Sequence, residues 1–276
     1  MKKWLMLSIC LVVRLCAQAE IVNGESPMVV VASYNNAEWY QKNLDSIFDQ
    51  KYNNYRVIYV DDCSPDGTGQ LVEDYINEKG QQDRVTLIRN TERKRALENL
   101  YNAIWLCDDK EIVVIVDGDD WLAHNGVLRH LNSVYANTHV WLTYGQFRSS
   151  MNGVLGFNKA IPREVVKNNR FRYHENQPSH LRTFYARLFK NIKKEDLLYQ
   201  GDFFKMTYDL AIMIPMLEMA GSHHQFIPDV LYIYNEDNPI SDHRVDRDLQ
   251  RLLDRFIRDM EPYQLLEKLF QTRTRG

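Results

Sequence analysis

Short apolar runs alternate with amphipathic segments along the chain from Ser26 onward. Four runs are rich in β-branched residues and have the length of strands; they cover residues 28–33, 55–60, 85–88 and 112–116. Apolar residues at helical spacing predict helices between these runs, over residues 39–50, 71–76 and 95–106. Strands that alternate with helices in this way predict βαβ units. We therefore expect an α/β fold with a doubly wound, mostly parallel sheet that is flanked by helices.

The pattern is weaker in the second half of the chain. It predicts a helix over residues 126–135, a strand over 140–146, a helix over 210–220 that contains Pro215, and a strand over 230–234. Residues 148–205 are richer in Asn, Arg, Lys and aromatic residues, and predict no regular element. From Val245 an apolar stripe with a basic opposite face predicts a C-terminal helical extension. We expect this helix to pack on the domain, and contact with a membrane is the alternative.

Composition and charge are those of an ordinary globular protein. The 276 residues include 45% hydrophobic and 26% charged side chains, with a net charge of −3, which gives no indication of a nucleic-acid surface. A chain of this length can bury a large core. We divide it into an N-terminal segment (1–19), the two halves of one domain (26–150 and 151–240) and the C-terminal extension (241–276).

The first 19 residues have the order of a secretory signal peptide. Lys2 and Lys3 precede an apolar run over residues 4–13, and a small-x-small site ends at Ala19. The run is shorter than the roughly 20 residues that span a bilayer. Arg14 at its end departs from the signal-peptide pattern, so an uncleaved anchor is the alternative. Cleavage predicts a secretory route, to a periplasm or to the lumen of the ER or Golgi; the alternatives are a membrane-anchored or a cytoplasmic protein.

Cleavage would leave two cysteines, Cys63 and Cys107. Two cysteines do not make a disulfide framework, so we expect both thiols to be free.

The strand over residues 112–116 ends at three carboxylates, Asp117, Asp119 and Asp120. Ligands bind beyond the carboxyl ends of strands in open α/β sheets. On extended chain Asp117 and Asp119 point to the same side, where they can share one hard cation, and the small Gly118 lets a phosphate approach the backbone. The alternative interpretation is an acidic turn without a ligand.

Four motifs follow one another in the first half of the chain. They are Val31-Ala-Ser-Tyr-Asn35; Glu38, Leu44, Ser46 and Gln50; Val60-Asp-Asp-Cys-Ser-Pro-Asp-Gly-Thr68; and Val116-Asp-Gly-Asp-Asp-Trp-Leu122. In this order they resemble the motifs of the family 2 glycosyltransferases of the GT-A fold. The resemblance implies a nucleotide-sugar donor, a divalent metal (usually Mn²⁺ or Mg²⁺) and an inverting displacement.

The resemblance also implies residues that bind the donor. The first motif contains Ser33, Tyr34 and Asn35, and the ring of Tyr34 could stack on a uracil. Asp61 could accept a hydrogen bond from the N–H of the base. Asp62 could accept this bond instead, or it could simply cap the turn. Arg95, after Arg93 and Lys94, lies where a diphosphate is expected, although a solvated basic cluster is an equal alternative. The donor-binding set is Ser33, Tyr34, Asn35, Asp61, Asp62, Arg95, Asp117 and Gly118.

The metal is assigned to the acidic motif that follows the strand over residues 112–116, which contains Asp117, Asp119 and Asp120. The resemblance implies that Asp119 binds the metal and that Asp117 faces the metal or the ribose. We expect Asp119 to have no protein partner when metal is absent. Many GT-A enzymes add a late histidine, for which the candidates are His223, His224 and His243.

The acceptor site and the catalytic base are expected in the second half. His180 and Arg182 would share one face of extended chain, suited to phosphate or acceptor, although an ordinary charged loop is as good an interpretation. Asp209 precedes the helix over 210–220, where the family has an acidic motif, but Tyr208 stands in place of the usual glutamate. We assign the base to Asp209; an N-cap is the alternative, and Asp202 and Asp196 are rival bases.

Together these features predict transfer of a sugar from a nucleotide diphosphate donor, most simply UDP, to an acceptor hydroxyl on a glycan, lipid or protein. One alternative is a nucleotidyltransferase, but the loop over residues 33–36 lacks the glycine-rich, lysine-containing pattern that such an enzyme needs. The other is a non-catalytic module that binds a nucleotide-sugar or a glycan.

Overall fold

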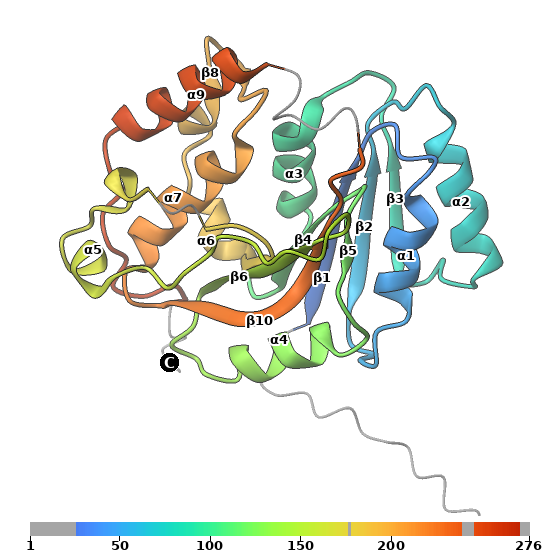
Figure 1. Ribbon diagram of the computed structural model, residues 1–276, viewed down its shortest axis with the longest axis horizontal. Helices are drawn as coiled ribbons and strands as arrows, with labels where there is room; N and C mark the ends of the chain where they lie inside the picture. The colour runs from blue at the N-terminus through green and yellow to red at the C-terminus, as the bar shows by residue number, and fades with distance from the viewer. Residues whose placement is uncertain (1–25, 176–177, 239–245, 271–276) are drawn as a thin grey trace, which may run out of the picture.

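The protein folds around one eight-stranded sheet (Figure 1). The computed structural model describes residues 26–175, 178–238 and 246–270. The strand order is β3-β2-β1-β4-β7-β6-β10-β5. The strands are β1 (Pro27–Ser33), β2 (Arg56–Asp61), β3 (Val85–Arg89), β4 (Ile112–Asp117), β5 (Trp121–Leu122), β6 (Leu142–Ser149), β7 (Arg182–Tyr185) and β10 (His224–Tyr234), with a separate pair β8 (Leu198–Tyr199) and β9 (Asp202–Phe203).

Neighbouring strands are parallel except at β7 and β5. β7 runs antiparallel to both β4 and β6, and β5 runs antiparallel to β10. The mostly parallel, doubly wound sheet that the sequence predicts is therefore confirmed for β3, β2, β1 and β4. The N-terminal signal segment lies outside the described residues, and its role stays a prediction.

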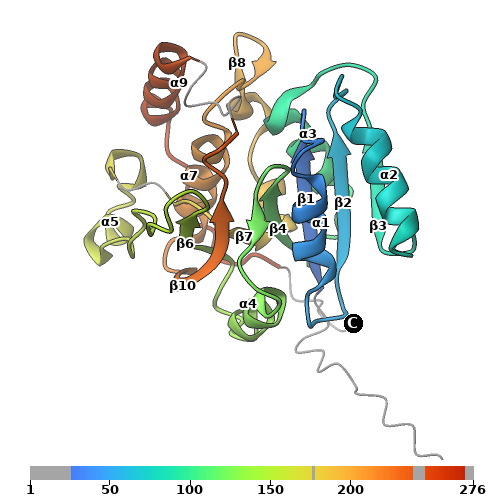
Figure 2. The ribbon, with the colours of Figure 1, turned by 45° about the vertical axis from the view of Figure 1, so that its right-hand side comes forward.

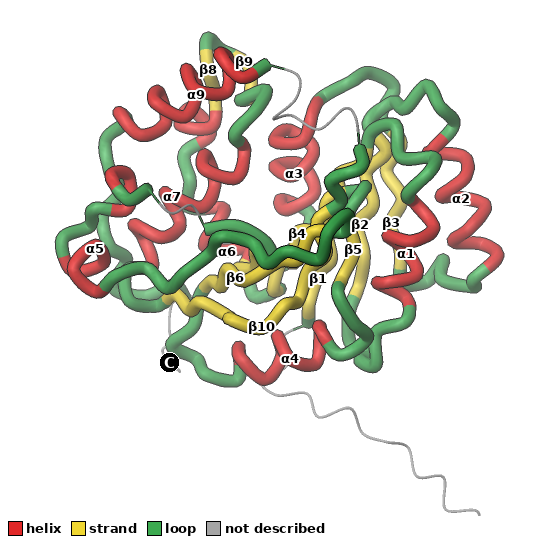
Figure 3. The backbone as a smooth tube through the Cα atoms, in the orientation of Figure 1, coloured by secondary structure: helices red, strands yellow, loops and turns green. Residues whose placement is uncertain are grey.

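Helices cover both faces of the sheet (Figure 3). They are α1 (Tyr40–Phe48), α2 (Thr68–Glu78), α3 (Arg95–Trp105), α4 (Val127–Tyr135), α5 (Arg163–Lys167), α6 (Ala186–Lys190), α7 (Tyr208–Ala220) and α9 (Arg247–Asp259), with 3₁₀ turns η1 (Phe171–Tyr173) and η2 (Lys194–Leu197). The helices predicted around residues 39–50, 71–76, 95–106, 126–135 and 210–220 are all present, each within a few residues of its predicted bounds.

The core consists of two apolar layers, one on each face of the sheet. In β1, Val29 and Val31 pack with α1, α2 and α4, whereas Met28 and Val30 pack with α3 and the helices of the second half. Figure 2 shows the helices on either side of β1 and β2. A strand that is buried on both faces needs apolar residues at every position, which is why these strands read as continuous apolar runs.

The sequence did not predict β7, which fills the gap between β4 and β6. Its four residues, Arg182 to Tyr185, are all buried, and two of them are polar. Thr183 exchanges side-chain hydrogen bonds with Tyr135 at 2.8 Å and Thr143 at 2.6 Å. A strand of four residues, two of them polar, makes no continuous apolar run, so only its tertiary partners identify it as a strand.

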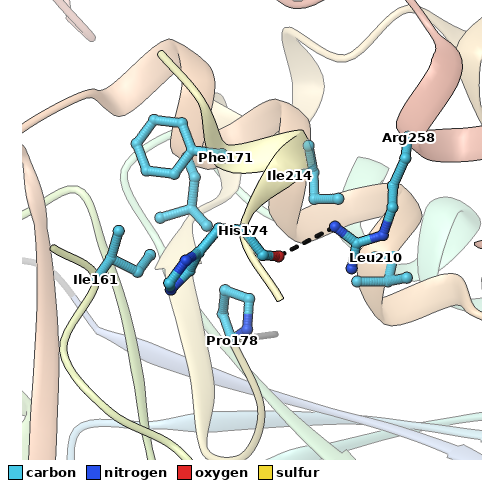
Figure 4. A pocket seen from close by; sticks show the side chains of 8 residues that line it. Ile161, Phe171, His174, Pro178, Leu210, Ile214 and Arg258 are labelled. Atoms are coloured by element: carbon cyan, nitrogen blue, oxygen red, sulfur yellow. Dashed lines mark hydrogen bonds between the residues drawn. The ribbon is translucent and has the colours of Figure 1, made fainter. Parts of the chain in front are cut away.

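The C-terminal helix packs on the domain, as predicted, through Leu253 and Ile257. A buried ion pair, Arg172 Nε to Glu218 Oε1 at 2.7 Å, lies beneath it. Arg258 donates to the carbonyl oxygen of His174 at 3.1 Å, beside a cavity of about 10 Å³ that has room for a single water (Figure 4). Among the described residues, no helix combines the length and the apolarity that a membrane crossing requires.

Candidate active site

The carboxyl ends of β1, β2 and β4 meet at one edge of the sheet. Ser33 pairs with Asp61, and Ala32 pairs with Asp117. A cavity of about 720 Å³ opens at this edge. Its lining includes Ser33, Tyr34, Asp62, Arg93, Arg95, Asp117, Asp119, Asp120, His180, Arg182, Tyr208 and Asp209. Residues predicted to bind the donor and residues predicted to act on the acceptor therefore share one cavity.

The loop after β1 is held by the turn that follows β2. The backbone N–H of Asn35 donates to Ser64 Oγ at 3.0 Å, and that of Asn36 donates to Thr68 Oγ1 at 2.9 Å. Asp66 accepts from the N–H of Ala37 at 3.0 Å through one oxygen and from the N–H of Thr68 at 3.0 Å through the other. The Ser64-to-Thr68 motif thus builds the loop that carries Tyr34 into the cavity.

Acid is expected to loosen this loop. Burial acts to raise the pKa of Asp66, but hydrogen bonds from Thr68 and Ala37 outweigh it and hold the pKa below its ordinary value. A lowered carboxyl pKa adds stability that is complete above the unfolded value of about 3.9 and is lost as pH falls through the folded value. Urea unfolding between pH 6 and 3 should therefore show a falling free energy of unfolding below about pH 4, and Asp66→Asn should flatten that fall. The exposed Asp74→Asn on α2 is the matched control; equal effects of both variants would contradict this assignment.

The two aspartates that follow β2 have different surroundings. Asp62 lies in the cavity but accepts backbone hydrogen bonds from Lys94 and Arg95, at 2.8 Å each, at the start of α3. Burial acts to raise the pKa of Asp62, and these bonds, with others from Asn90 and Asn99, lower it overall. Asp61 is buried against Gly69, where an added Cβ would lie 2.6 Å from Asp61 Oδ2, and its Oδ1 has no hydrogen-bond partner among the described residues. Asp62 therefore caps α3, and the assignment of the base N–H to Asp61 stays a prediction.

Tyr34 already carries a stacked cation. The guanidinium of Arg93 lies 3.6 Å from the centre of the Tyr34 ring, and both side chains line the cavity. A nucleotide base that stacks on Tyr34 must use the opposite face of the ring or displace Arg93. Arg95 lines the cavity as well. Both arginines are exposed, so the assignment of Arg95 to the diphosphate stays a prediction beside the solvated basic cluster.

Close packing explains Gly118. An added Cβ would lie 2.6 Å from both the Ser33 side chain and Asn36 Nδ2, which occupy the space beside it. Ser33 Oγ accepts from Asn36 at 2.9 Å and from Tyr59 at 2.9 Å. The glycine lets the ends of β1 and β4 approach each other. Its predicted role of admitting a phosphate stays a prediction.

The three carboxylates after β4 are not equivalent. Both oxygens of Asp120 are bound inside the protein, by the Tyr232 hydroxyl at 2.7 Å and the Asn235 N–H at 2.7 Å. Burial, with Asp119 and Asp117 close by, raises the pKa of Asp120 well above its ordinary value. Asp119 Oδ2 accepts from Asn238 Nδ2 at 2.7 Å. The expectation that Asp119 has no protein partner is therefore wrong, because the chain beyond β10 returns over the cleft.

The oxygen-rich cluster fits a hard divalent cation. Besides the predicted pair Asp117 and Asp119, ligand atoms of Asp117, Asp120 and His180 all lie within 4.8 Å of one another. Asp117 is common to both sets. Burial and Arg182 lower the pKa of His180 well below its ordinary value, which keeps the imidazole neutral as a metal ligand must be. His223 and His224 do not line the cavity, and His243 lies outside the described residues.

His180 and Arg182 do not form a charged surface loop. Both are buried at the start of β7, where Arg182 Nη2 lies 3.1 Å from His180 Nε2 and 3.9 Å from Asp209 Oδ2. Burial acts to lower the pKa of Arg182, but Tyr208, Asp209 and Asp117 raise it above its ordinary value. Arg182 is thus a permanent cation among the carboxylates of the site.

Asp209 lies in the first turn of α7 with its carboxylate on the cavity. The N-cap of α7 is Thr207, so the alternative interpretation of Asp209 as N-cap is wrong. The rival bases lie elsewhere: Asp196 accepts from the Tyr263 hydroxyl at 2.5 Å, and Asp202 is an exposed residue of β9. Neither lines the cavity.

Comparison with known proteins bears directly on this arrangement. The sequence matches the family model described as "Glycosyl transferase family 2" over residues 28–198. The chain belongs to this family. It is 30% identical over 98 residues to the "Putative glycosyltransferase EpsE" of Bacillus subtilis (strain 168), a match that covers 36% of this chain and 34% of that relative.

Solved structures of glycosyltransferases share the fold of this family 2 chain. S. aureus TarS in complex with UDP-GlcNAc has a TM-score of 0.58 at 17% identity, over 86% of this chain and 68% of that one. The mannosyltransferase PcManGT from Pyrobaculum calidifontis, in complex with GDP-Man and Mn²⁺, has a TM-score of 0.53 at 22% identity, over 75% and 56%. The predicted family and the GT-A fold are confirmed.

Sequence reasoning missed the side chains that hold the acidic motif from a distance. Asn43 of α1 donates to the backbone oxygens of Asp117 at 2.9 Å and Asp120 at 2.8 Å. Asn43 is a buried polar residue on the apolar face of α1, beside Leu44 and Ile47, and that position is the signal that was available. No comparable signal marks Tyr232 or Asn238, because both reach the motif only through the path of the chain.

Tyr208 connects the two sides of the site. Its hydroxyl donates to Asp117 Oδ1 at 2.6 Å and accepts from Arg182 Nη1 at 3.3 Å. Tyr208→Phe should lower the free energy of unfolding by about 1–3 kcal/mol, because the buried Arg182 and the half-buried Asp117 each lose a hydrogen-bond partner. Chemical denaturation measures this loss. Tyr199, whose hydroxyl makes no hydrogen bond to any described residue, gives the control Tyr199→Phe; a loss of equal size there would show that the hydroxyl of Tyr208 is not the cause.

Proposed function

We propose that this protein is a metal-dependent, inverting glycosyltransferase that moves a sugar from a UDP donor to an acceptor hydroxyl. One observation carries the proposal: the carboxylate of Asp209 and the acidic motif after β4 line the same cavity. The two sides of this cavity come from distant parts of the chain, since Tyr208, which donates a hydrogen bond to Asp117, follows it by 91 residues. A base and a diphosphate site on one cavity are what a single displacement at a sugar carbon needs.

The donor would occupy the cavity with its base near Tyr34 and its diphosphate toward Arg95 and the acidic motif. Asp117 and Asp119 would hold the cation, which when bound neutralises the leaving diphosphate as a Lewis acid. UDP as the nucleotide is supported by the TarS complex with UDP-GlcNAc, whereas PcManGT carries GDP-Man.

Asp209 would act on the acceptor side. Its carboxylate takes the proton of the acceptor hydroxyl while that oxygen forms a bond to the anomeric carbon and the bond to the diphosphate breaks. The buried Arg182 guanidinium, 3.9 Å away, balances the charge of Asp209. A displacement from the face opposite the leaving group inverts the anomeric configuration.

Nucleotide binding tests the donor assignment. Thermal unfolding of the purified protein should show a higher melting temperature with UDP and Mn²⁺ together than with UDP and EDTA, because a ligand that binds only the folded state stabilises it. GDP in place of UDP should give a smaller shift. A larger shift with GDP would overturn the choice of nucleotide, and no shift with any nucleotide would overturn the proposal.

Turnover separates the enzyme from the non-catalytic alternative. A panel of nucleotide-sugars is incubated with the protein and Mn²⁺, and nucleotide release is measured. Metal-dependent release from at least one donor supports the proposed transferase. Tight, metal-dependent UDP binding with no release from any donor, in water or with acceptors, would instead favour a binding module.

A further inference from the structure

The segment that follows β6 exposes an unusual amount of apolar surface. Within seven residues, Met151, Val154, Leu155 and Phe157 have exposed fractions of 58%, 61%, 52% and 59%. In Figure 3 this segment crosses in front of the sheet as part of a long loop. Single exposed apolar residues are normal on proteins, but four together in one short segment indicate a contact surface.

The backbone of this segment is firmly held, so the exposure is built into the fold. The N–H of Ser149 donates to the carbonyl of Val154 at 2.9 Å, and the N–H of Gly153 donates back to Ser149 at 3.1 Å. Gly153 has a positive φ of 70°, which glycine adopts without strain. The N–H of Gly156 donates to the carbonyl of Phe147 at 2.9 Å, and an added Cβ at Gly156 would collide with the Phe147 ring.

Three of the four apolar side chains face the active-site cavity. Val154, Leu155 and Phe157, here called the apolar wall, line the same cavity as Asp209, whereas Met151 does not line it. Phe147 packs edge-on against Phe157, with ring centres 5.8 Å apart. The cavity therefore has a polar part, where the donor is proposed to bind, and an apolar part that the donor does not explain.

The polar groups beside the apolar wall are engaged in the scaffold. The Ser149 hydroxyl donates to Glu236 at 2.6 Å, and Arg148 donates to the carbonyl of Gly153 at 2.8 Å. The wall thus offers a ligand mainly hydrophobic contact. Two of its three residues are aliphatic, which suits a hydrocarbon chain better than a sugar ring, since sugars need hydrogen-bonding partners around a stacked aromatic ring.

We propose that the acceptor hydroxyl is carried by a lipid, whose hydrocarbon chain packs on the apolar wall while the hydroxyl reaches Asp209. This inference rests on the proposed function and names its acceptor class. Charge supports a lipid. Residues 148–170 contain five basic residues and one acidic residue in a chain whose net charge is −3, and all five basic side chains are exposed. None of the five lines the cavity. They belong to the chain segment that carries the apolar wall, and clusters of basic residues favour anionic lipid surfaces.

Two alkyl glucosides probe the wall without knowledge of the natural acceptor. Calorimetry on the full chain with Mn²⁺, with and without UDP, measures the binding of n-octyl and methyl β-D-glucoside. Both glucosides are kept below the concentration at which octyl glucoside forms micelles. Burying only two methylenes of the octyl chain strengthens binding about tenfold, so the wild type should prefer octyl glucoside by at least about that factor. Leu155→Ser/Phe157→Ser should remove the preference, whereas Met151→Ser, equally exposed but outside the cavity, should keep it.

Equal binding of the two glucosides to the wild type would overturn the proposal. So would a loss with Met151→Ser as large as that with the double variant, because the segment would then bind hydrocarbon, or a membrane, without reference to the cavity. UDP affinity is measured in parallel and should be the same in all three proteins. A protein that binds no UDP but still prefers octyl glucoside would refute the donor assignment and not the apolar wall.

Discussion

Replacing Asp209 by asparagine should lower kcat by about 10²–10⁴-fold, the usual contribution of a general base, and leave UDP binding unchanged. Asparagine has nearly the same shape but cannot take a proton from the acceptor. Asp209 lies at the first turn of α7 and not at its N-cap, so the substitution does not remove a cap. Steady-state turnover together with UDP calorimetry on the same preparation separates catalysis from binding.

Two further variants test whether Asp209 is the general base. Asp202→Asn, at an exposed carboxylate outside the cavity, should keep normal turnover. Glu236 is an acidic residue that lines the cavity outside the acidic motif after β4, and its Oε2 accepts from the Ser149 hydroxyl. If Glu236→Gln abolishes turnover and Asp209→Asn does not, the base is Glu236 and the assignment of Asp209 is wrong.

Replacing Asp119 by asparagine should weaken Mn²⁺ binding by at least about 100-fold, because even the loss of a residue that only supports a ligand costs about 10–100-fold. The amide oxygen of asparagine can still accept the hydrogen bond from Asn238, so the fold should survive. The wild type should gain thermal stability from Mn²⁺, since a bound cation relieves the repulsion among the carboxylates. The variant should not gain it, and its UDP binding should become independent of the metal.

The competing ligand set predicts a different outcome for the same variant. If the cation is held by Asp117, Asp120 and His180, then Asp119→Asn keeps most of the Mn²⁺-dependent rise in melting temperature and His180→Ala loses it. That pattern would remove Asp119 from the metal site, while Asp117 would stay in it.

The first half of the fold was predictable because its signals are local. β1, β2 and β4 are buried on both faces, and each therefore appears as an unbroken apolar run that ends at a polar residue. β7 was not predictable, because Arg182 and Thr183 are satisfied inside the sheet only by groups from α7, α4 and β6. Its insertion between β4 and β6 depends on contacts that no local pattern shows.

The positions of the site residues were easier to predict than their roles. Asp62, Asp66 and Thr68 stand in a motif that resembles donor-binding residues, yet each makes hydrogen bonds that build the loops of the cleft. The partners Asn43, Tyr208, Tyr232 and Asn238 come from other parts of the chain. The role of a residue depends on the atoms that it contacts. The sequence shows residue types and their spacing, but it does not show these contacts.

The central claim is that this protein breaks the bond between a sugar and UDP with inversion, with the help of a divalent cation. The most direct test is proton NMR of the sugar first released when the purified protein hydrolyses an α-linked UDP-sugar in the presence of Mn²⁺, observed before the anomers equilibrate. We expect the β-anomer to appear first, with one UDP for each sugar, and EDTA to stop the release. Initial release of the α-anomer, or release that EDTA leaves unchanged, would contradict it.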